Sequence, residues 1–363
     1  MAPDRIYLDH AATTPMLPQA VLAVKDAMLR WANPSSPHSE GRAARAALED
    51  ARHRIAAAYG WPHELILTSG ASESLYIALR RSMAKHRLIT AVEHDSVLRH
   101  SEGAGVLAVR PTGQVDLDAL RAAMQPGTLV CVQWANSETG VKQPIESIAR
   151  IVREFGGLLL VDAAQMPARA DDAPLLYADF IAVSAHKRGG PPGIGALMIR
   201  DFATLLPVGG QEKGYRAGTE NLPGALGYAA ALEVPEPLEP LRDLRRKLDF
   251  AVEQAGGTIV GYGVENTPAI RAYRMPGLSA AAQLIRFDLA GYAVSAGSAC
   301  SSGSMRPSHV LTAMGWQESE LREVIRVSFG RKTSKEETHA FAKLWQNMAQ
   351  SARHGGLQAF ERT

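Results

Sequence analysis

The chain has 363 residues, of which 46% are hydrophobic and 21% are charged. This composition is that of an ordinary globular protein, and the length exceeds what a single core usually serves, so we expect two domains. The formal net charge of +2 gives no reason to expect nucleic acid or an anionic membrane as the main partner. No secretory signal or membrane-spanning stretch is recognisable, so we expect a cytoplasmic protein.

Strands and helices are predicted to alternate along the first two thirds of the chain. Apolar runs that end in small or polar residues, typical of buried strands, occur at 65–70, 128–135, 157–165 and 179–187. Apolar residues recur every three or four positions over 116–124 and 144–156, which predicts helices. This alternation favours an α/β fold with a mostly parallel sheet covered on both faces, and ligands bind such sheets beyond the carboxyl ends of the strands.

A stretch rich in proline and glutamate, EVPEPLEPL at 233–241, follows an alanine-rich segment. We interpret it as a domain boundary. The last third of the chain has shorter strands, such as YAVSAG and VIRVSFG, and ends in an amphipathic helix. This pattern predicts a smaller α+β domain.

The two cysteines, Cys131 and Cys300, have different surroundings. Cys131 lies inside an apolar strand, where an inert core thiol is expected. Cys300 lies among small residues in SAGSACSSGS, and the two cysteines lack metal-ligand spacing, so neither a disulfide nor a metal site is expected. A nucleophilic role for Cys300 remains open.

Lys187 and Asp162 each follow a predicted buried strand. Most lysines in loops are solvated, but a partly desolvated lysine at a strand end can act as an amine nucleophile. Asp162 follows four apolar residues and needs a cationic partner there. The protonated ring nitrogen of pyridoxal phosphate is such a partner, and Gln165 could then bond the phenolic oxygen of the ring, although an ordinary turn residue is the simpler interpretation.

The segment LTSGASES at 67–74 reads as a strand that leads into a helix. Backbone amides and the Ser72 hydroxyl at the start of that helix could hold a phosphate. A plain helix cap with Glu73 in the first turn explains the segment equally well.

Taken together, ten stretches in order resemble the cysteine desulfurases of the class V aminotransferase family, in particular the NifS and IscS types. The stretches are IYLDHAATTP (6–15), NPSSPHSEGRAARAALEDAR (33–52), TSGASES (68–74), VEHDSVL (92–98), ANSETGVKQP (135–144), VDAAQ (161–165), SAHKRGGPPGIGAL (184–197), GGQEKGYRAGTEN (209–221), SAGSACSSGS (295–304) and IRVSFGR (325–331). The resemblance implies a type I fold of the pyridoxal phosphate-dependent transferases. A large domain at 15–235 with a seven-stranded sheet would carry Lys187, and a small domain formed by 1–14 and 236–363 would carry Cys300 and Arg326.

The same resemblance implies a binding site for pyridoxal 5'-phosphate. Lys187 would hold the cofactor as a Schiff base, Asp162 would face the ring nitrogen, and Thr219 would reach the cofactor of a partner subunit in a homodimer. The remaining cofactor-binding residues would be Ala71, Ser72, Ser184 and His186 at the phosphate, Gln165 and Asn136 at the phenolic oxygen, and His94 stacked on the ring.

The implied reaction converts L-cysteine to L-alanine. Lys187, Cys300 and His94 would be catalytic, with His94 moving protons, while Asn136 and Arg326 would bind the substrate, Arg326 through its carboxylate. The Cys300 thiolate would attack the substrate sulfur and carry it as a persulfide to an acceptor, such as an iron–sulfur scaffold or a thiolation protein. Small residues around Cys300 are expected to let it move between these positions.

Three alternatives remain: a selenocysteine lyase, another class V aminotransferase, and a non-catalytic paralogue that binds a partner. The chain also departs from the family pattern at Leu75, Tyr76, Ser137 and Val208. We expect these departures to alter dimer packing or partner contacts, with Tyr76 filling space at the start of its helix.

Overall fold

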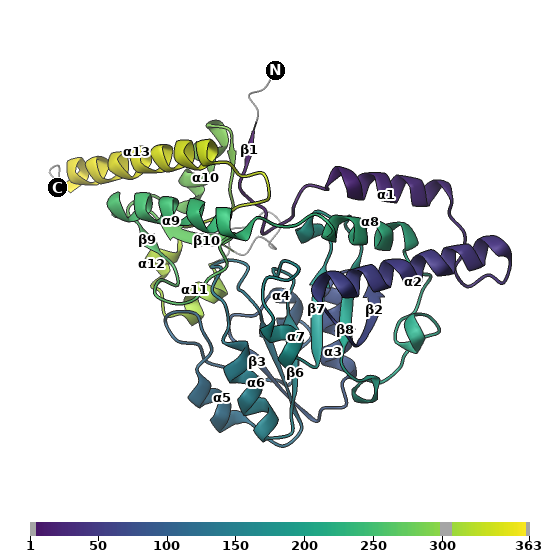
Figure 1. Ribbon diagram of the computed structural model, residues 1–363. Coiled ribbons are helices and arrows are strands. Elements are labelled where there is room, and N and C mark those ends of the chain that lie inside the picture. Colours follow the sequence, from purple (N-terminus) through teal and green to yellow (C-terminus); the bar gives the residue numbers. More distant parts are fainter. Residues whose placement is uncertain (1–4, 298–306, 361–363) are drawn as a thin grey trace.

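The structure, a computed structural model, describes residues 5–297 and 307–360, with side chains as far as Arg353 (Figure 1). Cys300 and the expected movement of its segment lie outside the described residues. Within those ranges, none of the helices is sufficiently long and apolar to span a membrane.

The largest sheet has seven strands, as expected, in the spatial order β2-β8-β7-β6-β5-β3-β4. In chain order they are β2 (Glu64–Thr68), β3 (His86–Thr90), β4 (Gly105–Leu107), β5 (Thr128–Gln133), β6 (Leu158–Asp162), β7 (Phe180–Ser184) and β8 (Gly195–Ile199). Strand β8 runs antiparallel to both neighbours, and the pairs from β7 to β4 are all parallel. The expectation of a mostly parallel sheet is therefore confirmed.

Successive side chains of a strand point to opposite faces, and the two faces of this sheet have separate cores. Val130 and Val132 of β5 pack in one core with helices on one face, while Leu129 and Cys131 pack in the other. The first face is covered by α2 (Ser39–Tyr59), α5 (Leu117–Ala123), α6 (Ile145–Glu154) and α8 (Leu222–Leu232), and the second by α3 (Ala71–Arg81) and α4 (Asp95–Leu98). Cys131 is fully buried, so it is a core thiol.

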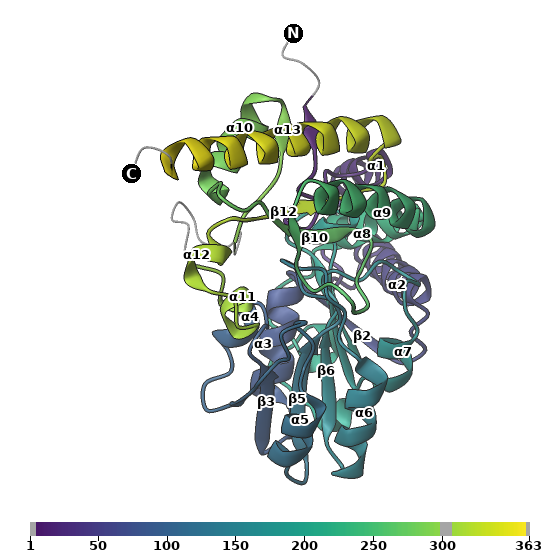
Figure 2. The same ribbon diagram turned by 90° about the vertical axis from the view of Figure 1, so that its left-hand side faces the viewer.

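A second, smaller layer contains a three-stranded antiparallel sheet, β12-β10-β9, and a parallel pair formed by β1 and β11. Figure 2 shows this layer above the large sheet. Its strands are β1 (Ile6–Tyr7), β9 (Thr258–Ile259), β10 (Ile270–Arg274), β11 (Tyr292–Ala293) and β12 (Val324–Ser328), and its helices are α9 (Leu238–Gln254), α10 (Ala280–Leu289), α11 (His309–Ala313), α12 (Glu318–Leu321) and α13 (Lys335–Phe360).

The chain crosses between the two layers at residues 233–237, between α8 and α9. The core of the smaller layer contains Leu8 and residues from Leu241 onward, whereas the cores of the large sheet end at Leu232. This separation supports the predicted boundary, while the division into two domains stays a prediction. Helices α1 (Pro18–Leu29) and α7 (Ala173–Tyr177) and the short 3-10 turns η1 (His186–Arg188), η2 (Phe202–Thr204) and η3 (Glu212–Gly214) complete the described elements.

A buried ion pair fixes the loop at 207–221, which follows the large sheet. The Arg52 guanidinium on α2 donates two hydrogen bonds to the Glu212 carboxylate, at 2.5 and 3.1 Å, and a third to the Leu65 carbonyl. Glu212 also accepts a hydrogen bond from the Leu67 amide of β2, at 2.7 Å. The loop is therefore tied to both α2 and β2.

We predict that Arg52→Met lowers the free energy of unfolding by about 3 kcal/mol or more, because the Glu212 carboxylate would stay buried without its cation. Equilibrium unfolding in urea measures this change. The matched control is Arg54→Met on the same helix, which breaks a more exposed pair with Glu233 and should cost less than about 1 kcal/mol. Equal losses in the two variants would contradict the prediction.

Candidate functional site

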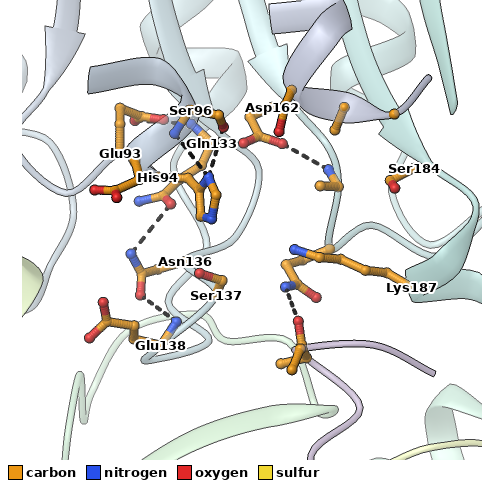
Figure 3. Close-up of a pocket in the computed structure, with 18 of the residues that line it drawn as sticks. Glu93, His94, Ser96, Gln133, Asn136, Ser137, Glu138, Asp162, Ser184 and Lys187 are labelled. Carbon is orange, nitrogen blue, oxygen red and sulfur yellow. Dashed lines mark hydrogen bonds between the residues drawn. The ribbon is translucent and has the colours of Figure 1, made fainter. Parts of the chain in front are cut away.

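A cavity of about 480 Å³ opens at the carboxyl ends of β5, β6 and β7 (Figure 3). Parallel strands end at one edge of a sheet, so residues that follow them meet there. Ten of the predicted site residues line this cavity: Ala71, Ser72, His94, Asn136, Asp162, Gln165, Ser184, His186, Lys187 and Arg326. Thr219 is exposed and does not line it.

Lys187 lies in η1, directly after β7. The N-terminal segment crosses this turn, where the Thr14 hydroxyl donates to the Lys187 carbonyl at 3.2 Å. Neighbouring His186 is half-buried, and burial, together with the charges of Lys187 and Arg188, lowers its pKa to about 4. His186 is therefore a neutral side chain at the cavity wall at neutral pH.

His94 caps the first turn of α4, and its Nδ1 accepts a hydrogen bond from the Ser96 amide at 3.2 Å. An imidazole nitrogen that accepts carries no proton, so the proton of neutral His94 is on Nε2. Burial is the main cause that lowers the pKa of His94, and the charge of Lys187 acts in the same direction. The ring is thus held in one tautomer beside the cavity.

Asp162 is the last residue of β6 and Gln165 lies on the turn that follows, and both are buried. The Asp162 carboxylate accepts a hydrogen bond from the Ala164 amide at 3.0 Å. The Gln165 side-chain amide donates to the Ala11 carbonyl at 2.9 Å, which ties the N-terminal segment to this turn. These contacts hold a carboxylate and an amide in the cavity wall.

Asn136 lies in the cavity wall, but its side chain is engaged within the protein. Its amide nitrogen donates to the carbonyl of Val92 and the side chain of Gln133, and its oxygen accepts from the amides of Glu138 and Thr139. The contacts of Asn136 with the cofactor and the substrate stay predictions, and a donated contact would require exchange of one of these hydrogen bonds.

Arg326 comes from β12 of the smaller layer, and its two hydrogen-bond partners lie 189 and 317 positions away in the sequence. Its guanidinium donates to the Asp9 carboxylate at 2.7 Å and to the Ser137 carbonyl at 2.9 Å. The side chain is almost completely buried, yet its Nε has no hydrogen-bond partner among the described residues. A buried donor without a partner is costly, and this unused donor belongs to a residue that lines the cavity.

The first turn of α3 contributes Ala71 and Ser72. The first amides of a helix have no partner within it, and none is found for these two among the described residues. The chain approaches itself closely here: a Cβ at Gly195 of β8 would lie 2.7 Å from the Gly70 Cα. Gly70 itself has φ +155°, which favours glycine.

The cavity also contains polar residues that the sequence analysis missed, chiefly Glu93, Glu138 and His309. The Glu93 carboxyl is fully buried, and one of its oxygens has no partner within the described residues. Ser308 donates a hydrogen bond to the Glu138 carboxylate at 2.5 Å, and Nε2 of His309 donates one to the Glu93 carbonyl at 2.9 Å. These two hydrogen bonds attach the start of α11 to the cavity wall. The sequence offered one signal for Glu93, a carboxylate that directly follows Ala91 and Val92 and precedes His94.

The departures from the family pattern have different surroundings. Leu75 is fully buried, whereas Tyr76 and Val208 are exposed. Tyr76 contacts the ring of His100 edge-on, with ring centroids 5.0 Å apart. The interpretation that Tyr76 fills space is therefore wrong, because the first turns of α3 turn this position to the surface.

Comparison with known proteins places these observations in a family. A family model described as aminotransferase class-V matches residues 6–341. A relative from Bacillus subtilis named putative cysteine desulfurase IscS 1 is 36% identical, with 94% of this chain and 97% of the relative covered.

Two solved structures agree with this result. A NifS-like protein from Rickettsia africae has a TM-score of 0.86 at 31% identity, covering 94% of this chain and 99% of that one. A structure described as SspA in complex with cysteine has a TM-score of 0.78 at 30% identity, covering 91% and 100%. The chain therefore belongs to the class V aminotransferase family and, within it, to the cysteine desulfurases of the NifS and IscS type.

Proposed function

We propose that the protein converts L-cysteine to L-alanine and transfers the sulfur to Cys300. The carbon–sulfur bond of the substrate breaks, a sulfur–sulfur bond forms at Cys300, and the carbon that loses sulfur gains a proton. The substrate carbon is reduced and the sulfur is oxidised to the persulfide level, so no external oxidant or reductant is needed.

One observation carries this proposal: Lys187, Asp162 and Arg326, from three distant segments, line the same cavity. An amine, a carboxylate and a guanidinium suit a cofactor aldehyde, a ring nitrogen and an amino acid carboxylate respectively. The relative that was solved with cysteine supports the choice of substrate.

The residues present fit pyridoxal phosphate, on which class V aminotransferases depend. Lys187 would hold it, Asp162 would face its ring nitrogen, and the free amides of Ala71 and Ser72 would bind its phosphate. When bound, the cofactor supplies a ring that accepts electrons from the substrate α-carbon.

The other residues of the cavity act on the substrate and on protons. Arg326, held by Asp9 and the Ser137 carbonyl, binds the substrate carboxylate and sets the orientation of the amino acid. His94 gives and takes a proton at Nε2, since its Nδ1 is occupied by the Ser96 amide. The Cys300 thiolate attacks the substrate sulfur.

The proposed assembly is a homodimer in which Thr219 reaches the partner's cofactor. Exposure of Thr219 outside its own cavity supports this role. Helix α1 exposes Leu22, Met28 and Leu29, an apolar face that a second copy would cover. The sulfur acceptor is proposed to be an iron–sulfur scaffold or a thiolation protein, and the location is proposed to be cytoplasmic.

We predict that the protein loaded with pyridoxal phosphate forms alanine from L-cysteine, and that Cys300→Ala reduces this rate by at least a hundredfold, because no thiolate remains to accept the sulfur. Alanine and sulfide are measured in the presence of a thiol reductant. Cys131→Ala is the matched control and should keep most of the activity, since Cys131 is a buried core thiol.

Unchanged alanine formation in Cys300→Ala would contradict the proposal. Faster release of selenide from L-selenocysteine, independent of Cys300, would favour a selenocysteine lyase. Amino transfer to a keto acid would favour an aminotransferase, and a protein that cannot bind the cofactor would favour the non-catalytic alternative.

We also predict an effect of pH that depends on Glu93. Burial, reinforced by the charge of Asp162, raises the pKa of Glu93 to about 8 in the folded protein, so folding favours its protonated form. Stability of the cofactor-free protein is then lost as pH rises from about 4.5 to about 8. Changes of stability above pH 6.5 are the informative ones. His10 and His186 have pKa values lowered to about 4 in the folded protein, so they change the stability mainly below pH 6.5.

Urea unfolding of the cofactor-free parent and of Glu93→Gln measures this effect. Relative to the variant, the parent should lose up to about 1.4 kcal/mol per pH unit between pH 6.5 and 8. If the free energies of unfolding of the parent and of Glu93→Gln changed equally with pH between 6.5 and 8, Glu93 would not titrate there.

A further inference from the structure

An ion pair lies at the edge of the cavity, between the first turn of α3 and the loop at 207–221. Glu73, which lines the cavity, accepts a hydrogen bond from the Ser69 amide with one carboxylate oxygen and from Nε of Arg216 with the other, at 2.9 Å. The two side chains are only 25% and 20% exposed. This pair has no part in the reaction proposed above.

Glu73 presents an electrostatic problem at this position. Its carboxylate follows directly after Ala71 and Ser72, whose free amides are the proposed phosphate site. Although burial opposes its ionisation, hydrogen bonds from Ser69 and Arg216 lower the pKa of Glu73. An ionised carboxylate beside a phosphate would repel it unless a cation cancels its charge.

Arg216 is held where it can cancel that charge. Its backbone pairs with Gln211, and a Cβ at Gly209 would lie 2.2 Å from the Arg216 carbonyl oxygen, so the loop is tightly closed around it. The buried pair of Arg52 and Glu212 anchors the same loop to α2. Arg216 therefore approaches Glu73 from a fixed backbone rather than from a free surface.

We propose that Arg216 is a positioning residue for the cofactor phosphate: it neutralises Glu73 and holds it on the Ser69 amide, which leaves the first amides of α3 for the anion. This inference rests on the proposed function, because it assumes that the anion is the phosphate of pyridoxal phosphate. It assigns Arg216 to the protein's own cavity, whereas Thr219 of the same loop is proposed to serve the partner subunit.

The test is a double-mutant cycle on the full-length protein, with affinity measured by the absorbance of bound cofactor. Arg216→Gln should weaken pyridoxal phosphate binding roughly ten- to hundredfold, the range for an uncancelled unit charge several ångströms from the anion. Glu73→Gln should not weaken binding, and Arg216→Gln combined with Glu73→Gln should restore affinity to within about threefold of the parent. Arg216→Lys should also retain most of it.

Pyridoxal, which lacks the phosphate, is the matched ligand, and its affinity should be the same in the parent and Arg216→Gln. Thermal stabilisation by inorganic phosphate should follow the same cycle as pyridoxal phosphate. Arg80→Gln, which removes a cation near the other end of α3, is the control for overall charge and should have no effect on affinity.

Equal weakening for pyridoxal and pyridoxal phosphate, or no recovery in the double variant, would overturn the proposal and show that Arg216 only supports the loop. A second outcome would refute the proposed function but not the role of Arg216. In it, inorganic phosphate stabilises the parent and the variants as the cycle predicts, but the parent forms no borohydride-reducible adduct with pyridoxal phosphate. The two failures are therefore distinguishable.

Discussion

The site depends on one constraint, the common direction of β5, β6 and β7. Because these strands are parallel and adjacent, the residues that follow them meet at one edge of the sheet. Asn136, Asp162 and Lys187 each lie within three residues of a strand end. The chemistry of the cavity thus follows from the topology of a buried sheet, which also keeps these side chains on a rigid support.

The smaller layer completes the cavity from the other side. Strand β12 brings Arg326 to Asp9 and to the Ser137 carbonyl, and α11 brings Ser308 and His309 to the wall that contains Glu93. The buried guanidinium keeps one donor without a partner among the described residues, and its other contacts fix its orientation. Arg326 therefore both lines the cavity and joins the two layers.

The sequence predicted features that depend on neighbouring residues, and missed contacts between residues that are far apart in the chain. The strands were recognisable because apolar runs end in polar residues, and Lys187 and Asp162 stood out because each charge follows such a run. The antiparallel direction of β8 and the pairing of Arg326 with Asp9, 317 positions away, depend on tertiary packing that no local pattern encodes. The hydrogen bonds that engage Asn136, and the burial of the Glu93 side chain, depend on the same packing.

The central claim is that this cavity holds pyridoxal phosphate through Lys187. Borohydride reduction of the loaded protein, followed by digestion and mass spectrometry of the peptides, tests it most directly because reduction makes the link to the lysine permanent. The account predicts a single modified peptide, the one that contains Lys187. Modification at another lysine, such as Lys142, or the absence of any modified peptide, would contradict it.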